Sequence, residues 1–148
     1  MPFSDDEQIL LEENSKLKVA IIVVSFLLFG ISFFNIAFCT TNACRLSFEV
    51  FLLGWFGMLM DITAISWLAN LFLFIAWVLL TKNKNYAWIF GLLATVLSLS
   101  LLCTDSVIDN EGGTCNSITK IGLGYWLWTA SCLTAFIGGL LFRKSKYK

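Results

Sequence analysis

The sequence predicts an all-α fold: an integral membrane four-helix bundle with an additional outer interfacial or re-entrant helix before the second span. Three observations predict it. Hydrophobic residues make up 58% of the chain and charged residues 14%, whereas soluble domains average roughly 45–50% and 25%. Long segments without charge alternate with short polar connections. Lysine and arginine also gather on one side of the topology that these segments imply.

Four segments have the length of a membrane-crossing helix, for which about 20 mostly apolar residues suffice. We expect spans at about 19–39, 63–80, 86–103 and 123–142. Residues 19–142 then form the transmembrane domain. Residues 1–18 are expected to form a cytoplasmic N-terminal tail, and residues 143–148 a basic cytoplasmic tail.

The stretch 48–80 is too long for one straight helix across a hydrocarbon core of about 30 Å. Glu49 and Asp61 are its only ionisable residues, and either Asp61 or Thr63 can cap a new helix. We therefore expect a break near Asp61 and an interfacial or re-entrant helix at 48–61. Trp55 suits such a helix because indole rings favour the headgroup level.

The charges predict the orientation, since cytoplasmic loops are enriched in lysine and arginine. Arg45 and Lys120 lie on one side of the predicted membrane. Eight basic residues lie on the other side: Lys16, Lys18, Lys82, Lys84, Arg143, Lys144, Lys146 and Lys148. Both termini are therefore predicted to be cytoplasmic, and the loops around 40–62 and 104–122 to face outward.

Small residues recur at intervals of four in the last two spans, where they share a helix face. They are Ala87, Gly91 and Thr95 in one span, and Ser131, Ala135 and Gly139 in the other. Small side chains allow helix backbones to approach closely in membranes. We predict a close helix contact on each face. The partner can be another helix of this chain, a second copy in a homo-oligomer, or another membrane protein.

The cysteines predict disulfide bonds, because four of the five lie at the outward surface, where the compartment permits them. Among three pairings, the local one joins Cys39 to Cys44 and Cys103 to Cys115. Cys132 is expected to be a buried thiol in the last span.

Three polar residues are candidates for a ligand site: Asp61, Asn70 and Arg45. Ionisable or amide groups within membrane segments often mark function, although capping explains Asp61 and a bond between helices explains Asn70. The chain contains no histidine, so we predict neither a metal site nor Ser/His catalysis. Nucleic acid is not an expected partner, because there is no basic stripe.

The layout of four spans with two outward cysteine pairs resembles the bacterial quinone-linked thiol oxidases of the DsbB type. That resemblance implies a redox role for Cys39, Cys44, Cys103 and Cys115, with Arg45 near a quinone. The first pair departs from the family pattern, because CTTNAC stands here in place of C-x-x-C. Structural disulfides in the outer loops explain the same residues.

A second resemblance is to small uncharacterised four-span bacterial membrane proteins that carry GW-x-G, WLAN and GY-x-LW-x-x-S stretches. These stretches occur here at Gly54–Gly57, Trp67–Asn70 and Gly124–Ser131. The resemblance implies a multi-pass protein of the bacterial inner membrane and no particular chemistry.

The sequence therefore predicts a non-enzymatic interaction, sensing or assembly component with the lipid bilayer as its surroundings and no cofactor. Two alternatives stay open. One is an oligomeric pore or small-solute carrier. The other is a membrane thiol-disulfide oxidoreductase, the only alternative that requires a quinone.

Overall fold

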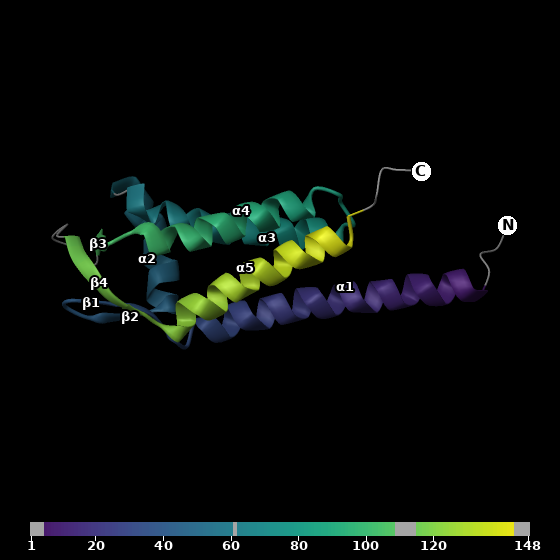
Figure 1. Ribbon diagram of the computed structural model, residues 1–148, viewed down its shortest axis with the longest axis horizontal. Helices are drawn as coiled ribbons and strands as arrows, with labels where there is room; N and C mark the ends of the chain where they lie inside the picture. The colour runs from purple at the N-terminus through teal and green to yellow at the C-terminus, as the bar shows by residue number, and fades with distance from the viewer. Residues whose placement is uncertain (1–4, 61, 109–114, 144–148) are drawn as a thin grey trace.

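The computed structural model describes residues 5–60, 62–108 and 115–143. Five α-helices, two short 3₁₀ helices and four strands follow one another in this part of the chain. In order they are α1 (Asp5–Ser32), β1 (Ile36–Thr40), β2 (Cys44–Leu46), α2 (Ser47–Met60), η1 (Ile62–Trp67), α3 (Leu68–Thr81), α4 (Ala87–Ser100), η2 (Leu101–Cys103), β3 (Ser106–Ile108), β4 (Cys115–Ile121) and α5 (Leu123–Leu141). Helices α1, α3, α4 and α5 lie side by side, with the sheet at one end and the start of α1 and the end of α5 at the other (Figure 1).

The predicted all-α fold is wrong, because the outer segments form a four-stranded antiparallel sheet in the order β2-β1-β4-β3. Strand β1 comes from the end of the predicted first span. Strands β2, β3 and β4 come from segments expected to be loops. The chain is therefore a mixed α/β protein in which a small sheet covers one end of the helices (Figure 1).

The sheet forms because residues far apart in sequence pair with each other. In the central pair, Phe38 lies opposite Ile121 and Cys39 opposite Lys120. The buried side chains Ala37 and Phe38 pack with Leu101 and Tyr125 where the sheet meets the helices. Such pairing satisfies the backbone groups of the outer segments.

Helix α1 ends at Ser32 because the next turn satisfies its last carbonyl groups. The side-chain amide of Asn35 donates to the carbonyl of Ile31 at 2.9 Å, and its backbone N–H donates to Ser32 at 3.0 Å. This is the capping that a helix C-terminus requires. At its other end the helix begins at Asp5 and includes much of the predicted 1–18 tail.

The predicted four-helix membrane bundle also needs correction. Among the described residues, two helical segments are long and apolar enough to cross a membrane, Glu12–Ser32 and Leu123–Leu141. The segments Ile65–Thr81 and Ala87–Cys103 are shorter apolar helices. The second of them ends where the chain turns toward β3 after Cys103.

Helix α5 is central to the packing, since it contacts both α1 and α4, and α4 in turn packs on α3. Helix α2 runs crosswise at the sheet end (Figure 1). The described turn between α3 and α4 contains Asn83 in the left-handed conformation, at φ 53°, which asparagine tolerates better than most residues. A second core lies between the helices: Phe29, Leu73, Ala76, Ala94, Cys132 and Ala135.

Candidate functional site

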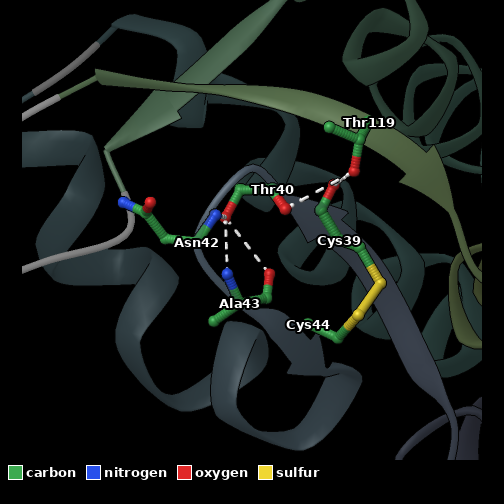
Figure 2. The surroundings of a disulfide bond; sticks show 6 residues. All are labelled: Cys39, Thr40, Asn42, Ala43, Cys44 and Thr119. Carbon is green, nitrogen blue, oxygen red and sulfur yellow. Dashed lines mark hydrogen bonds between the residues drawn. A yellow bond between two sulfur atoms is a disulfide. The ribbon is translucent and has the colours of Figure 1, made fainter.

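The sheet end carries a hairpin that a disulfide bond closes. Cys39 and Cys44 are opposite each other in the β1–β2 register and form a disulfide bond, which confirms this predicted pair. The hydroxyl of Thr40 donates to the carbonyl of Ala43 at 3.1 Å and accepts the backbone N–H of Asn42 at 3.4 Å. Figure 2 shows this turn beside the disulfide. Covalent and hydrogen bonds therefore hold the hairpin in a single shape.

Strand β4 fixes the hairpin in place from its other side. The hydroxyl of Thr119 donates to the carbonyl of Cys39 at 3.1 Å (Figure 2). The amide of Asn42 donates to the side-chain oxygen of Asn116 at 2.9 Å. The hairpin is thus a rigid, solvent-facing part of the sheet.

The other cysteines are arranged differently from the prediction. Cys103 is a free, exposed thiol at the end of η2, and Cys132 is a free, fully buried one in α5. In the β3–β4 register, Cys115 lies opposite Ile108. Ile108 is five residues along the chain from Cys103, and a disulfide bond needs Cα atoms within about 7 Å of each other. The predicted Cys103–Cys115 pair does not fit this register. The side chain of Cys115 lies outside the described residues.

The three residues of the candidate polar site are not gathered in one place by the described contacts. Asp61 lies outside the described residues. Arg45 belongs to β2, opposite Phe38 in the sheet. Asn70 is 5% exposed inside the helical layer.

Asn70 holds three elements together. Its oxygen accepts the indole N–H of Trp128 at 2.9 Å, and its amide donates to the carbonyl of Trp67 at 3.1 Å. The indole of Trp67 donates in turn to the carbonyl of Phe51 at 2.9 Å. These bonds link α5, α3, η1 and α2, so the amide acts as a bond between helices.

A polar residue in an apolar span is expected to face other helices, as Ser25 does, but its partners in a second buried network were missed. The indole of Trp77 donates to the hydroxyl of Ser25 at 2.8 Å, and Ser25 donates to the carbonyl of Ser131 at 2.8 Å. The polar position of Ser25 within an apolar segment was the only available signal. Its partner Trp77 belongs to another helix, so the residues near Ser25 in the sequence do not indicate it.

Tyr125 was also missed, because an aromatic residue at the start of a span suggests a headgroup position. It is instead 2% exposed, and its hydroxyl donates to the carbonyl of Ser98 at 3.0 Å. Tyr125 therefore joins α5 to α4.

The two small-residue faces meet each other. A Cβ atom on Gly91 would lie 2.6 Å from the Cα of Phe136, and one on Gly139 would lie 2.6 Å from the Cα of Trp88. Real Cβ atoms do not approach this closely. All six predicted residues are buried: Ala87, Gly91, Thr95, Ser131, Ala135 and Gly139. The contact is therefore made between α4 and α5 of the same chain.

Lys18, Lys82, Lys84 and Arg143 lie at the end of the molecule opposite the sheet, whereas Arg45 and Lys120 belong to the sheet. The ammonium of Lys18 donates to the side-chain oxygen of Asn83 at 2.6 Å, which sets α1 beside the α3–α4 turn. The guanidinium of Arg143 lies 4.9 Å from the ring centroid of Trp88. These contacts bring Lys18 of α1, the α3–α4 turn and Arg143 after α5 to the same end of the molecule.

No group of three or more Cys, Asp or Glu side chains that could hold a metal ion occurs in the described part of the chain. Comparison with protein-family models, curated proteins and solved structures finds no significant match.

Proposed function

We propose that this chain is a multi-pass protein of the cytoplasmic membrane whose outer sheet has a non-enzymatic interaction or assembly role. The distribution of side chains across the helices is the observation that carries the proposal. The helices expose many large apolar side chains, while small and hydroxyl-bearing residues occupy much of the space between them.

Every long helix contributes to the apolar surface. The following side chains are each more than 36% exposed: Val23, Val24, Leu27 and Ile31 on α1; Leu71 and Val78 on α3; Leu92, Val96 and Leu99 on α4; and Leu133, Ile137 and Leu140 on α5. Monomeric soluble proteins rarely expose large contiguous apolar patches. A lipid environment removes the free-energy cost of such a surface.

The interior contains more hydroxyl groups than a soluble core of this size usually does. Ser25, Ser98 and Ser131 are fully buried beside apolar residues such as Leu73, whereas many leucines and valines of the same helices are exposed. Their hydroxyls donate to backbone carbonyls. Small and hydroxyl-bearing residues between helices are typical of membrane proteins, because lipid does not drive leucine inward.

The dimensions fit a bilayer. Helix α5 contains 19 residues, which corresponds to about 28 Å at 1.5 Å per residue. The hydrocarbon core is about 30 Å thick. Helices α1 and α5 are proposed to cross the membrane.

Two independent features support the same orientation. Cytoplasmic regions are enriched in lysine and arginine, and the end opposite the sheet carries Lys18, Lys82, Lys84 and Arg143. Disulfide bonds persist in oxidising compartments outside the cytosol, and the Cys39–Cys44 bond lies on the sheet. The sheet is therefore proposed to face outward and both termini to face the cytosol.

The interaction role follows from what remains free for recognition. The buried polar groups of Ser25, Asn70 and Tyr125 are used for hydrogen bonds within the helical layer. The sheet presents a rigid hairpin and the edge strand β2. Edge strands and fixed hairpins are common protein-recognition surfaces. The partner is proposed to be another membrane protein or a second copy of the chain.

Site-specific photo-crosslinking tests this role. A photoreactive amino acid replaces exposed Thr41 at the hairpin tip, and the matched control replaces exposed Lys84 at the opposite end. We expect a discrete adduct from position 41, whether with a partner or with a second copy, and none of the same size from position 84. The interaction role is contradicted if neither Thr41 nor Asn42 yields an adduct in cells.

A second candidate function is thiol–disulfide exchange. It is favoured because Cys44 of the disulfide bond is exposed and Cys103 is an exposed free thiol. Both lie at the sheet end of the molecule. Purified protein would then reduce a quinone when supplied with a dithiol, and Cys39→Ser would abolish the reaction. Equal rates in wild type and Cys39→Ser would eliminate this candidate.

A further inference from the structure

A pocket of about 360 Å³ opens where the helices meet the sheet. One wall is the turn that leaves α1, with Phe34 and Ile36; the other is the end of β4 and the start of α5, with Lys120, Gly122 and Leu123. The backbone N–H of Gly122 donates to the carbonyl of Ala37 at 2.8 Å and joins the two walls. The pocket is therefore formed by fixed backbone at the boundary between sheet and helical layer.

A lysine provides the charge of this pocket. Lys120 is exposed and pairs with Cys39 through the backbone of β4 and β1. Within the described residues, the observed ion pair joins Lys16 to Glu12, far from Lys120. The ammonium of Lys120 is thus available to an anion. The amino end of α5 adds its partial positive charge to the same wall.

The rim of the pocket is apolar. Phe34 is 86% exposed and Leu123 is 60% exposed, and both line the pocket together with Ile36. A phenylalanine this exposed is unfavourable in water, whereas acyl chains would cover it. The lining therefore pairs a cation with apolar side chains, which is the chemistry that complements an anionic amphiphile.

The position agrees with this chemistry. The sheet lies at the outward end in the proposed orientation, so the pocket lies at the headgroup level of the outer leaflet. Below it are the apolar faces of α1 and α5. A phosphate at Lys120 and acyl chains beside Phe34 and Leu123 would each contact a group of matching polarity.

We propose that this junction pocket binds the headgroup of an anionic phospholipid, with the lipid phosphate at Lys120 and the acyl chains against Phe34 and Leu123. The inference rests on the proposed membrane location. A lysine near the membrane surface favours an anionic lipid by about 1 kcal/mol, or roughly fivefold.

The test uses the full chain in phosphatidylcholine nanodiscs that contain equal small amounts of two photoreactive lipids, a phosphatidylglycerol and a phosphatidylcholine. Mass spectrometry then counts adducts on peptides that contain Phe34 or Leu123. We expect about five times as many phosphatidylglycerol adducts as phosphatidylcholine adducts. Lys120→Gln should make the two equal, whereas Lys120→Arg and the control Lys82→Gln should retain the preference.

Three results would overturn the inference: equal labelling by both lipids in the wild type, an unchanged preference in Lys120→Gln, or removal of the adducts by millimolar glycerol 1-phosphate. The last result would mean that the pocket takes a soluble phosphate. Failure of the proposed membrane location would look different, because no variant would then enter the nanodiscs.

Discussion

Ser25 and Ser131 join α1 to α5 through a reciprocal pair of hydrogen bonds. The hydroxyl of Ser25 donates to the carbonyl of Ser131 at 2.8 Å, and the hydroxyl of Ser131 donates to the carbonyl of Ser25 at 2.7 Å. Both residues are fully buried. Because the indole of Trp77 also donates to Ser25, three helices meet at this one hydroxyl.

Ser25→Ala should therefore destabilise the protein by about 1 kcal/mol or more, since helix-to-helix bonds in membranes average roughly 0.6 kcal/mol and an unpaired indole adds its desolvation cost. Unfolding in mixed detergent micelles, followed by far-UV circular dichroism, measures the change. Ser100→Ala is the control, because the hydroxyl of Ser100 donates to the carbonyl of Leu97 in its own helix. Equal losses in the two variants would contradict the proposed role of Ser25.

The α4–α5 contact predicts an unusual sensitivity to one methyl group. Gly91→Ala should cost about 1–3 kcal/mol, because the new Cβ meets the Phe136 backbone and overpacking costs about that much. Gly30→Ala is the matched control, since a Cβ there meets nothing within 4 Å. It should be neutral or stabilise by up to about 1 kcal/mol. A harmless Gly91→Ala in the same unfolding measurement would refute the close approach.

The Asn70–Trp128 pair distinguishes a bond between helices from a ligand site. Trp128→Phe and Asn70→Leu should each destabilise by about 1–2 kcal/mol. The first leaves the buried oxygen of Asn70 unpaired, and the second removes the acceptor of the partly buried indole. The double variant should lose less than the sum. A double-mutant cycle from thermal unfolding measures the coupling. Strict additivity would mean that the bond contributes nothing.

The hairpin disulfide should add a small amount to the free energy of unfolding. The cysteines are 5 residues apart, and chain entropy for so short a loop gives about 2 kcal/mol. Reductant should therefore lower the unfolding temperature of wild type and of Cys103→Ser by the same amount. The Cys39→Ser, Cys44→Ser double variant should be insensitive to it. A reductant effect that survives in the double variant would assign the sensitivity to another thiol.

Local patterns in the sequence predicted features that depend on local spacing. The four-residue spacing of Gly91 and of Gly139 defined helix faces, although only the structure shows that the two faces meet. The nearness of Cys39 to Cys44 in the chain predicted their disulfide bond. In both cases neighbouring residues carried the information.

The sheet could not be predicted in this way, because β1 pairs with β4 about eighty residues later. Residues 36–39 continue the apolar composition of α1, so composition alone extended the first span to Cys39. The helix actually ends through the side chain of Asn35, a single residue whose capping role depends on its backbone conformation. The all-α prediction failed at this residue.

Labelling with a membrane-impermeant maleimide tests the central claim most directly, that lipid surrounds the helices while the sheet faces outward. In a Cys115→Ser variant, Cys103 is the exposed free thiol at the sheet end. Lys84→Cys in a Cys103→Ser, Cys115→Ser background places a thiol at the opposite end instead. We predict that Cys103 is labelled without permeabilisation and that the cysteine at position 84 is labelled only after it. Labelling of position 84 in intact cells, or a chain that remains soluble without detergent, would contradict the account.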